Sequence, residues 1–487
     1  MTAIVNHLGQ PYAELLTPEY EATDTGRRMS FWGLSGSGPN AVISGGHNSL
    51  KYRARTLRRN NPVVAGAIDS YVSNMVGTDI APSWDLDNPE QKQELQDAWE
   101  RSVYEMDYYG AVDFYGLQEQ AAAGMVVDGE SLGRMVVTRR YAGLFIPLQI
   151  QMLEADHLDL HYNDWTASGN EIRLGIEWAG GTRKAYHLWK DHPGEQYLTS
   201  GNLERQRVPA ADMVHVFRPL RAGQQRGGSF LAPLLTKLYE IDQYDDAELV
   251  RKKTAAMWGG FFVNETPGAA GRVQNAPTSG ALEPGTFQKL SNGWKVQFSE
   301  PADVGANYDV FMKTQFRMIA RGLGITYEQL TGDLSDVNFS SIRAGLIEFR
   351  RLCEMIRTRT LVTQFTRPIV LRWLHIGMLA GAFKTIQLAE YLANPYRFQR
   401  IRYIPQAFDY VQPVVDRQAI RMDIRNGLTT REEQALLRGR NIDQIDRINR
   451  ERNRITDDYG LVYDSDPRHT TQSGAHQQAA ATGDEKP

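Results

Sequence analysis

One stretch of the sequence, from Arg226 to Gly260, has the residue spacing of a single long helix. Apolar residues recur every three or four positions through its first half and thin out in the second half. Ser229 can cap its start, and Pro233 is tolerated in the first turn because the first backbone N–H groups of a helix have no internal partner. Such a helix would be roughly 45 Å long at about 1.5 Å per residue, longer than most globular domains require.

The second half of this stretch carries an acidic block followed by a basic block. The acids are Asp242, Asp245, Asp246 and Glu248, and the bases are Arg251, Lys252 and Lys253. The basic end matches the negative pole of the helix dipole. Two interpretations are open: a solvated face in an ordinary domain, or a polar face that meets copies of itself or a water-filled channel. The length of the helix favours the second.

The composition excludes several classes of protein. With 487 residues, 41% hydrophobic and 23% charged, the chain can bury about two to four domains' worth of core. It lacks an apolar run of about 18 residues and the pattern of a signal peptide, so we expect no membrane span. The single cysteine, Cys353, excludes an internal disulfide framework and lies among apolar residues. Proteins that grip DNA tightly are usually basic; the net charge of −4 therefore predicts loose binding of nucleic acid, if any.

The N-terminal part changes character near residue 47. Residues 1–46 read as a flexible arm, in which Gly36 begins a G-x-G-x-x-A match that no strand precedes, so we expect no dinucleotide site. The next segment carries basic residues and no acid: Lys51, Arg53, Arg55, Arg58 and Arg59. A basic surface helix and a helix that contacts phosphates or a partner fit this segment equally well. Asn61 and Pro62 then predict a helix start.

The middle of the chain alternates helical and strand patterns. Helices are predicted over 88–110 and from Phe114 onward, and from Val126 to Val216 the period falls to two, which indicates a β-rich region. After the long helix, two short strands at 285–290 and 294–298 are expected to turn at Ser291, Asn292 and Gly293, followed by a helix from about Asn307 to Leu323. The predicted order is helix, small insertion, helix.

The C-terminal third is predicted to be mostly helical. A loop over 331–341 leads into a helix that Pro368 should kink or end. Its outer face is expected to carry Arg343, Arg350, Arg351, Arg357 and Arg359. Residues 413–455 predict short helices dense in both charge signs, which suit exposed surfaces at a subunit contact. The polar tail from His469 is expected to be disordered.

Two groups of residues could carry chemistry, and we favour structural roles for both. Strand alternation would place His157, Asp159 and His161 on one face at metal-ligand spacing, but surface strands often carry such residues without a metal. Asp128 and Glu130 could act as paired carboxylates, although Asp128 followed by glycine is more often a turn. The sequence holds neither a Walker A loop nor a G-x-S-x-G elbow. We therefore predict no cofactor, no bound metal and no catalysis.

Several segments together resemble the lambda-type portal proteins, or head–tail connectors, of tailed bacteriophages. They are 51–82, 126–137, 148–159, 208–249, 282–301 and 316–351. The resemblance covers most of residues 47–375. Single segments are weak signals, but the order in which all of them occur is specific to this family. Phe339 departs from the tyrosine common in the family, which leaves the assignment unchanged.

The resemblance implies an α+β portal-type subunit and a homo-oligomeric ring, usually a dodecamer, at one capsid vertex. Double-stranded DNA would enter the capsid through this ring during packaging and leave on infection. The implied partners are the terminase large subunit, the major capsid protein and the head-completion or tail connector proteins, with synthesis in the host bacterial cytoplasm. By analogy the chain divides into an arm (1–46), a wing (47–228), a first stem helix (229–258), a clip (259–306), a second stem helix (307–323), a tunnel loop and long helix returning to the wing (324–404), a crown-like helical region (405–465) and a disordered tail (466–487).

The resemblance also nominates residues for a DNA channel and for contacts between neighbouring copies. The channel candidates are Lys237, Lys313, Arg317, Asp333, Asn338, Ser340 and Arg343. The candidates for contacts between stems are Asp242, Asp245, Asp246, Glu248, Arg251, Lys252 and Lys253. A duct for DNA must not bind phosphate tightly, since each neutralised phosphate adds sequence-independent affinity, and a near-neutral chain meets that requirement.

Two alternative functions stay open at this point. The first is an enzyme acting on nucleic acid or polysaccharide through Asp128 and Glu130, or through the residues around Asp159. Alanine replacements there would abolish turnover without harming assembly. The second is another structural part of a virion, such as a tail or baseplate adaptor, which would have a different ring symmetry and no interaction with terminase.

Overall fold

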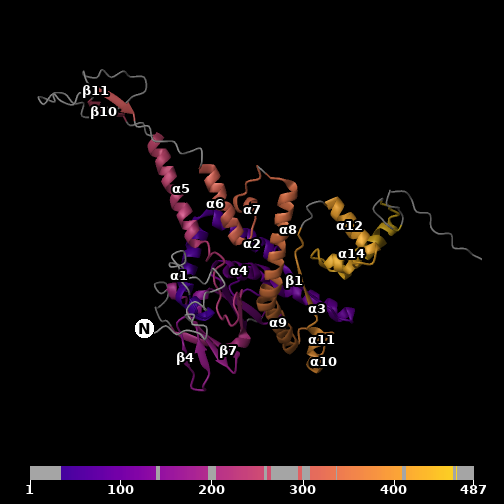
Figure 1. Cartoon of the computed structure of the whole chain (residues 1–487). Coiled ribbons are helices and arrows are strands. Elements are labelled where there is room, and N and C mark those ends of the chain that lie inside the picture. Colours follow the sequence, from indigo (N-terminus) through magenta and orange to yellow (C-terminus); the bar gives the residue numbers. More distant parts are fainter. Residues whose placement is uncertain are drawn as a thin grey trace, which may run out of the picture.

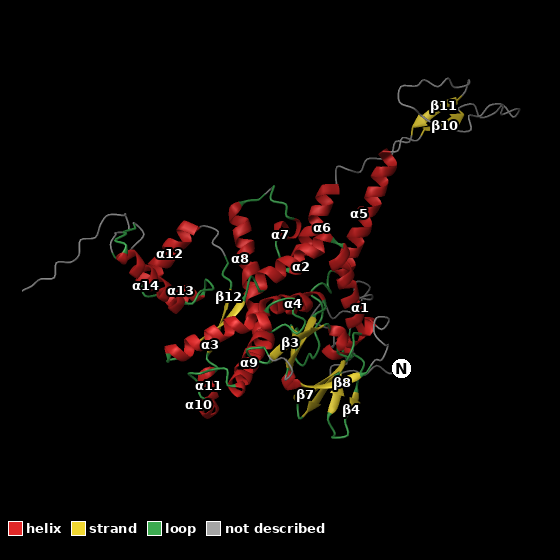
Figure 2. Cartoon of the chain, turned by 180° about the vertical axis from the view of Figure 1, so that it is seen from behind, coloured by secondary structure: helices red, strands yellow, loops and turns green. Residues whose placement is uncertain are grey.

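The computed structural model describes residues 35–138, 143–195, 204–256, 260–264, 294–298, 308–335, 337–408, 413–463 and 468. These residues form an α+β fold, with helices packed around antiparallel sheets. One helix, α5, extends away from the body, and the C-terminal helices lie on the opposite side of it (Figures 1 and 2).

The chain enters the fold through two helices, α1 (Pro39–Asn60) and α2 (Pro62–Met75). The side chain of Asn61 accepts hydrogen bonds from the backbone N–H groups of Val63 and Val64, which caps α2 as expected. The prediction of a flexible arm is wrong for residues 39–46, because Pro39 already has the backbone geometry of a first helical turn. Residues 1–34 lie outside the described part.

Two further helices supply much of the core. α3 (Pro89–Ser102), followed by the short η3 (Val103–Glu105), and α4 (Phe114–Val127) confirm the two helical patterns. Trp99 of α3 packs edge-to-face on Phe114 of α4, with ring centroids 5.1 Å apart. β1 (Ile80–Trp84) pairs antiparallel with β12 (Ile401–Pro405), which joins distant parts of the chain.

The β-rich region is confirmed as two antiparallel sheets. The first has the order β3-β2-β9, with β2 (Glu130–Val137), β3 (Leu148–Leu153) and β9 (Met213–Phe217). The second runs in sequence order through β4 (Asp164–Trp165), β5 (Glu171–Arg173), β6 (Ile176–Ala179), β7 (Thr182–Trp189) and β8 (Arg205–Pro209). The short helices η4 (Ala155–His157) and η6 (Ala210–Asp212) connect the sheets. A small core that includes Leu132, Ile176 and Tyr186 lies between them.

The long helix α5 (Leu235–Ala256) starts later than the sequence predicts. Residues 230–234 form turns, and the hydroxyl of Ser229 accepts from the backbone N–H of Leu231 instead of capping the helix. β10 (Gly260–Asn264) pairs with β11 (Trp294–Phe298), and α6 (Tyr308–Leu323) follows, so the order of helix, strands and helix is confirmed. The expected strand 285–290 and its turn lie outside the described residues, as does most of the span 259–306.

The C-terminal half of the core comes from one nearly continuous helical run. After α7 (Tyr327–Thr331), the run comprises α8 (Phe339–Ile356), the π-helical η8 (Arg357–Thr366) and α9 (Arg367–Ala380). The expected loop over 331–341 is therefore shorter than predicted. Pro368 does not end the helix, because it occupies the first turn of α9, where its missing N–H removes no bond.

Arg357 is placed differently from its prediction. The sequence placed this residue on the outer face of the helix, but its side chain is buried and lies 5.7 Å from the ring of Phe408. The π turns begin at Arg357 and change the angular position of the side chains. Cys353, one turn earlier, is buried as expected.

The C-terminal region contains the predicted short helices. α10 (Leu388–Ala393) and α11 (Pro395–Phe398) precede β12, and α12 (Pro413–Arg425), α13 (Arg431–Leu436) and α14 (Ile442–Asp458) follow it. The polar tail from His469 lies outside the described residues. Among the helices that the structure describes, none combines the length and apolarity needed to cross a membrane.

Candidate functional site

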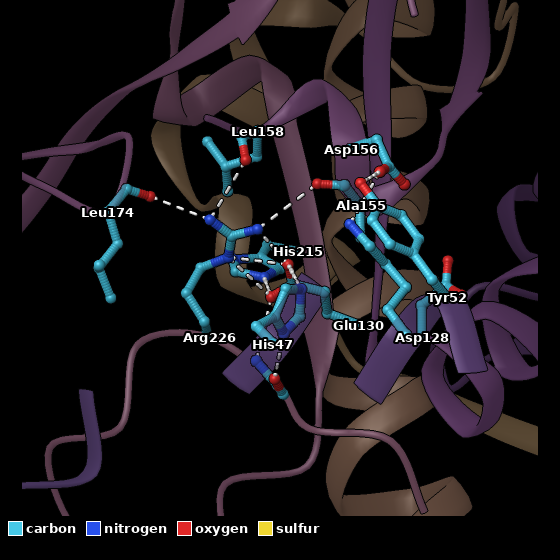
Figure 3. Close-up of polar contacts among 12 residues, drawn as sticks. His47, Tyr52, Asp128, Glu130, Ala155, Asp156, Leu158, Leu174, His215 and Arg226 are labelled. Carbon is cyan, nitrogen blue, oxygen red and sulfur yellow. Dashed lines mark hydrogen bonds and ion pairs between the residues drawn. The ribbon is translucent and has the colours of Figure 1, made fainter. Parts of the chain in front are cut away.

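A densely connected polar site lies where α1, the first sheet and the segment leading to α5 meet (Figure 3). α1 presents His47, Lys51 and Arg55 to this site, at intervals of four residues that place all three on one helix face. His47 and Lys51 are only 2% and 1% exposed. The prediction of a basic surface helix, or of one that contacts phosphates, is therefore wrong for Lys51 and Arg55, which face acids inside the protein.

Glu130, at the start of β2, is the centre of the first cluster. We define the Glu130 cluster as His47, Glu130, His215, Arg226 and Gly227. The Nε atom of Arg226 donates to both carboxylate oxygens at 2.8 and 2.9 Å, and the backbone N–H of Gly227 donates at 3.0 Å. His215 lies 3.0 Å and His47 3.3 Å from the carboxylate. One carboxylate thus joins α1, β2, β9 and the segment from Arg226 to Leu234 that leads into α5, which we call the root of α5.

The electrostatics of this cluster favour an ionised Glu130. Burial alone would raise the pKa of Glu130, but Arg226 and the hydrogen bonds from His215 and His47 hold that pKa well below its usual value. Burial lowers the pKa of His215, although the contact with Glu130 opposes this effect. The pair of Glu130 and Arg226 therefore stays charged inside the protein.

Arg226 extends the cluster to the second sheet. Its Nη1 atom donates to the carbonyl oxygens of Leu158 at 3.3 Å and Leu174 at 3.1 Å, and its Nη2 atom donates to that of Ala155 at 3.4 Å (Figure 3). These carbonyls belong to the segments that lead into and through the second sheet. A single guanidinium group therefore ties both sheets to the segment that begins α5.

Two glycines allow the backbone to come close enough for this arrangement. A Cβ atom on Gly227 would lie 1.9 Å from the carbonyl oxygen of Gly129, and one on Gly129 would lie 2.3 Å from a Gly228 backbone atom. Gly129 also has φ of +92°, a conformation that side chains rarely adopt. The turn expected at Asp128 and Gly129 is therefore a close contact with the root of α5.

The second group, the Asp156 cluster, consists of Lys51, Arg55, Asp128, Glu154 and Asp156. The Nζ atom of Lys51 lies 2.9 Å from Asp156, and Arg55 contacts Asp128 at 2.6 Å, Asp156 at 2.7 Å and Glu154 at 3.1 Å. Burial would raise the pKa of Asp156, but Lys51 and Arg55 lower it to about 2. Burial raises the pKa of Asp128 despite Arg55. Asp128 and Glu130, the two carboxylates that could act together in acid–base chemistry, are each bound to an arginine.

The predicted metal spacing at His157, Asp159 and His161 depends on a strand that does not form. His157 lies in η4, and Asp159 accepts from Arg205, with its Oδ2 atom 2.7 Å from Nη2. A different trio, Glu154, Asp156 and His192, brings its ligand atoms within 4.8 Å of one another. Arg55 already contacts both Glu154 and Asp156, so its guanidinium group supplies the positive charge that a metal ion would otherwise bring to this trio. His192 had no signal in the sequence.

The channel candidates lie on several elements. Lys237 is half-buried on α5, and Lys313 on α6 pairs with Asp309 at 3.2 Å. Arg317 lies over the ring of Tyr327 at 5.6 Å. Asp333, before α8, accepts from Tyr327 and Ser335.

The other channel candidates serve the start of α8. Asn338 caps this helix by accepting from the backbone N–H of Ser340 at 3.1 Å. Arg343 pairs with Asp416 at 3.2 Å. Contact of these residues with DNA stays a prediction.

The stem candidates make contacts within the chain. Glu248 pairs with Arg251 at 2.6 Å and with Lys252 at 3.9 Å, as an acidic block next to a basic block allows. Asp242 accepts from Asn61 at 3.2 Å, and Asp245 accepts from the hydroxyl of Tyr308. Asp246 and Lys253 are exposed.

Sequence comparison adds independent information. The pattern of the family described as "Phage portal protein, lambda family" matches residues 25–357. A "Probable portal protein" of Halomonas phage phiHAP-1 is 28% identical over 283 residues, which are 56% of this chain and 54% of that protein. "Portal protein B" of Escherichia phage lambda is 22% identical over 364 residues, covering 66% of this chain and 68% of that protein. The chain thus aligns with about half the length of the Halomonas phage protein.

Similar solved structures come from particles of a gene transfer agent. A chain in "Neck of native GTA particle computed with C12 symmetry" is 13% identical, with a TM-score of 0.49, and the match covers 81% of this chain and 93% of that one. A chain in the virion of the native gene transfer agent particle is 15% identical, with a TM-score of 0.47 and the same coverage.

Proposed function

Because this chain belongs to the lambda family of phage portal proteins, we propose that its copies close into a ring at one capsid vertex, around a channel for double-stranded DNA. DNA would enter the capsid through the channel during packaging and leave through it on infection. In this proposal α5 and α6 form the stem, the two sheets and the core helices form the wing, and the C-terminal helices form the crown.

One observation carries the proposal: within the part of the chain that the structure describes, each of the two stem helices has a face with largely exposed side chains. On α5, Tyr239 and Val250 are 58% and 61% exposed, and Asp246 lies between them on the same face. On α6, Val310 is 64% exposed and shares a face with the exposed Arg317 and Arg321. Both faces follow the spacing i, i+7 and i+11, which is the seam of a helix pair.

The two faces are complementary in charge. The α5 face carries the acid Asp246, with Lys253 near its C-terminal end, whereas the α6 face carries the bases Arg317 and Arg321. Arg321 also lies 3.7 Å from Glu348 of the same chain. α5 of one copy can therefore pack against α6 of the next copy, which is the head-to-tail contact that a closed ring needs. This packing would cover Tyr239 and Val250 and would repeat identically at every subunit boundary.

The channel surface follows from the same arrangement. With a net charge of −4, the chain suits a bore that does not hold phosphate tightly. Lys237 and Lys313 are the residues that we propose line the channel at the stem, and Asp333, Asn338, Ser340 and Arg343 would lie near DNA where the stem meets the wing. The terminase large subunit and the head-completion proteins would dock at the far end of the stem, and the major capsid protein would surround the wing.

Electron microscopy of the purified full chain tests this proposal. We expect rings with a central hole and one dominant subunit number, twelve if the chain follows its family. Protein that stays monomeric at every concentration and is absent from assembled particles would exclude a portal. Rings that form but never bind terminase would instead indicate another adaptor of the virion.

A further inference from the structure

A pocket of about 240 Å³ lies where the C-terminal end of α2, the junction of α8 with η8, and the segment after β12 meet (Figure 2). Two arginines, Arg350 and Arg357, line this pocket. The other lining residues that the structure describes are uncharged, namely Ser73, Asn74, Gly77, Gln406, Ala407 and Phe408. The described lining thus carries two positive charges and no acid, which favours an anion.

Arg357 is the residue of this pocket that needs a partner. It is only 6% exposed, and burial lowers the pKa of its guanidinium group, an effect that the exposed Glu354 opposes only in part. Within the described part of the chain, no hydrogen bond or ion pair reaches Arg357, and its guanidinium group lies 5.7 Å from the ring of Phe408. Because an arginine keeps its charge even when buried, an unpaired one favours a counter-ion in the pocket.

Arg350 brings a second positive charge to the same place. Its guanidinium group lies 4.8 Å from the centre of the Phe408 ring, so both arginines flank one aromatic side chain. The two residues are seven positions apart on the helical run, a spacing that directs side chains to the same side. Arg350 has further contacts within the chain, so the need for a counter-ion rests on Arg357.

Two neutral amides add hydrogen-bond donors to the pocket. The Oε1 atom of Gln406 accepts from the backbone N–H of Thr78 at 2.8 Å, and its Nε2 atom makes no hydrogen bond within the described residues. The Nδ2 atom of Asn74 donates to the carbonyl oxygen of Ser70 at 2.7 Å, which uses one of its two N–H groups. Guanidinium and amide donors around one space suit a ligand with several acceptor oxygens.

The size of the pocket limits the ligand to a small group. Pockets for drug-sized molecules usually measure about 300–1,000 Å³, and this pocket is smaller. A phosphate group carries up to two negative charges and at least three acceptor oxygens, so it matches two arginines better than a single carboxylate does. A phosphate inside a duplex is flanked by sugars on both sides, which leaves free or terminal phosphate as the fitting ligand.

We infer that this pocket binds one phosphate group, either inorganic phosphate or the terminal phosphate of a small molecule, through Arg357 and Arg350. The inference goes beyond the proposed ring and does not depend on it, because every lining residue named here comes from one chain. Bound phosphate would connect α2, the helical run and the segment that leads to the C-terminal helices. It would therefore stabilise the folded chain in proportion to its occupancy.

Thermal unfolding of the full chain tests the site, with inorganic phosphate in one series and sodium chloride of equal ionic strength in the other. Phosphate should raise the melting temperature progressively, and chloride should not match this rise. Arg357→Met should abolish the phosphate-dependent rise. It should not lower the melting temperature in phosphate-free buffer, because it removes an unpaired buried charge. Arg359→Met, the same change at an exposed position on η8, is the matched control and should keep the rise.

Calorimetric titration of the folded chain gives a second measurement. Inorganic phosphate should bind with one site per chain, and Arg357→Met should weaken this binding by about tenfold or more. Arg357→Lys keeps the charge but loses the planar fork of donors, so it should weaken binding less than Arg357→Met does. Adenosine monophosphate that binds as tightly as phosphate would identify terminal phosphates as ligands, and binding of phosphate alone would identify the free ion.

Three results would overturn the inference, whether or not rings form. The first is an equal rise with phosphate and chloride, and the second is a full phosphate-dependent rise in Arg357→Met. The third is displacement of phosphate by a DNA duplex without terminal phosphates. Phosphate binding that appears only after Asp409→Asn would also contradict it, because the acid next to Phe408 in the sequence would then be the natural partner of the pocket.

Discussion

Arg226 and Glu130 form an ion pair away from solvent: both side chains are 0% exposed, and the Nε atom of Arg226 lies 2.8 Å from a carboxylate oxygen of Glu130. A buried pair is often no more stabilising than well-packed apolar residues, but it fixes geometry, and removal of one partner leaves an unpaired charge inside the protein. Arg226 lies nine residues before the first residue of α5, Leu235, so this pair fixes the position of the segment that leads into the long helix.

Glu130→Gln should therefore lower the free energy of unfolding by about 3 to 5 kcal/mol, because Arg226 keeps its charge without a counter-charge. Urea unfolding of the full chain measures the change. Glu171→Gln, at the exposed pair with Arg173, is the control and should cost less than about 1 kcal/mol. Equal losses in the two variants would contradict a special role for the buried pair.

Asp156 should make the protein acid-sensitive. Its pKa is about 2 in the folded chain, against about 3.9 for a free side chain, so its contribution of about 2 kcal/mol is present above about pH 4 and is lost as the pH falls through about 2. Asp156→Asn should flatten the dependence of unfolding free energy on pH in this window. Asp97→Asn, at an exposed position, should leave the slope unchanged. A variant at Asp156 with the slope of the original chain would refute the assignment.

The glycine contact predicts a difference between two adjacent positions. Gly227→Ala would place a Cβ atom 1.9 Å from the carbonyl oxygen of Gly129, so the backbone must shift, at a cost of about 2 kcal/mol or more. Gly228→Ala meets no atom within 4 Å and should be tolerated. Thermal unfolding of both variants tests this, and equal melting temperatures would argue against the contact.

The proposed stem contact predicts an effect on assembly without an effect on folding. Asp246→Arg should raise the concentration for half-assembly about tenfold, because it would face Arg317 and Arg321 of the next copy. Glu240→Arg changes the same charge on a different face of α5 and serves as the control. Native mass spectrometry measures the fraction of assembled protein for each of the two variants. Similar assembly of both variants would place the subunit contact elsewhere.

Cys353 should be unreactive until the protein unfolds. Burial raises the pKa of its thiol to about 12, so the nucleophilic thiolate is scarce near neutral pH. A thiol reagent should label the native chain slowly and the urea-unfolded chain at once. Rapid labelling of the native chain would show that the α8 side of the core opens readily.

Much of the fold follows from local patterns. The period of two over 126–216 predicts the strands, although β2 and β9 are buried on both faces, and the apolar stripe from Phe114 to Met125 predicts α4 because those residues face the core. The start of α5 was missed because Ser229 and Pro233 satisfy the rules for a helix start, while the contact of Gly227 with Gly129 holds this segment in turns. That contact is distant in sequence, and no local pattern encodes it.

The site was harder to predict than the fold. His47, Lys51 and Arg55 have a regular spacing that predicts a shared helix face, but the same spacing suits a surface helix. Their burial depends on acids that arrive from β2 and η4, so only the folded chain brings the partners together. The sequence pattern placed Arg226 at the start of the long helix, and no local pattern indicates that its partner is Glu130, 96 residues earlier. The sequence identified the basic residues but could not predict which acids they contact.

The Glu130 cluster anchors the segment from which α5 starts. The 22 residues of this helix extend about 33 Å from its first residue, so a tilt of the helix by about 5° would move its C-terminal end by about 3 Å. In the proposed ring, the same small tilt in every copy would change the diameter of the opening between these ends by about twice that distance. The ion pair of Glu130 and Arg226, together with the contacts that Asn61 and Tyr308 make with Asp242 and Asp245 farther along α5, would then govern how constant the aperture stays while cargo moves through it.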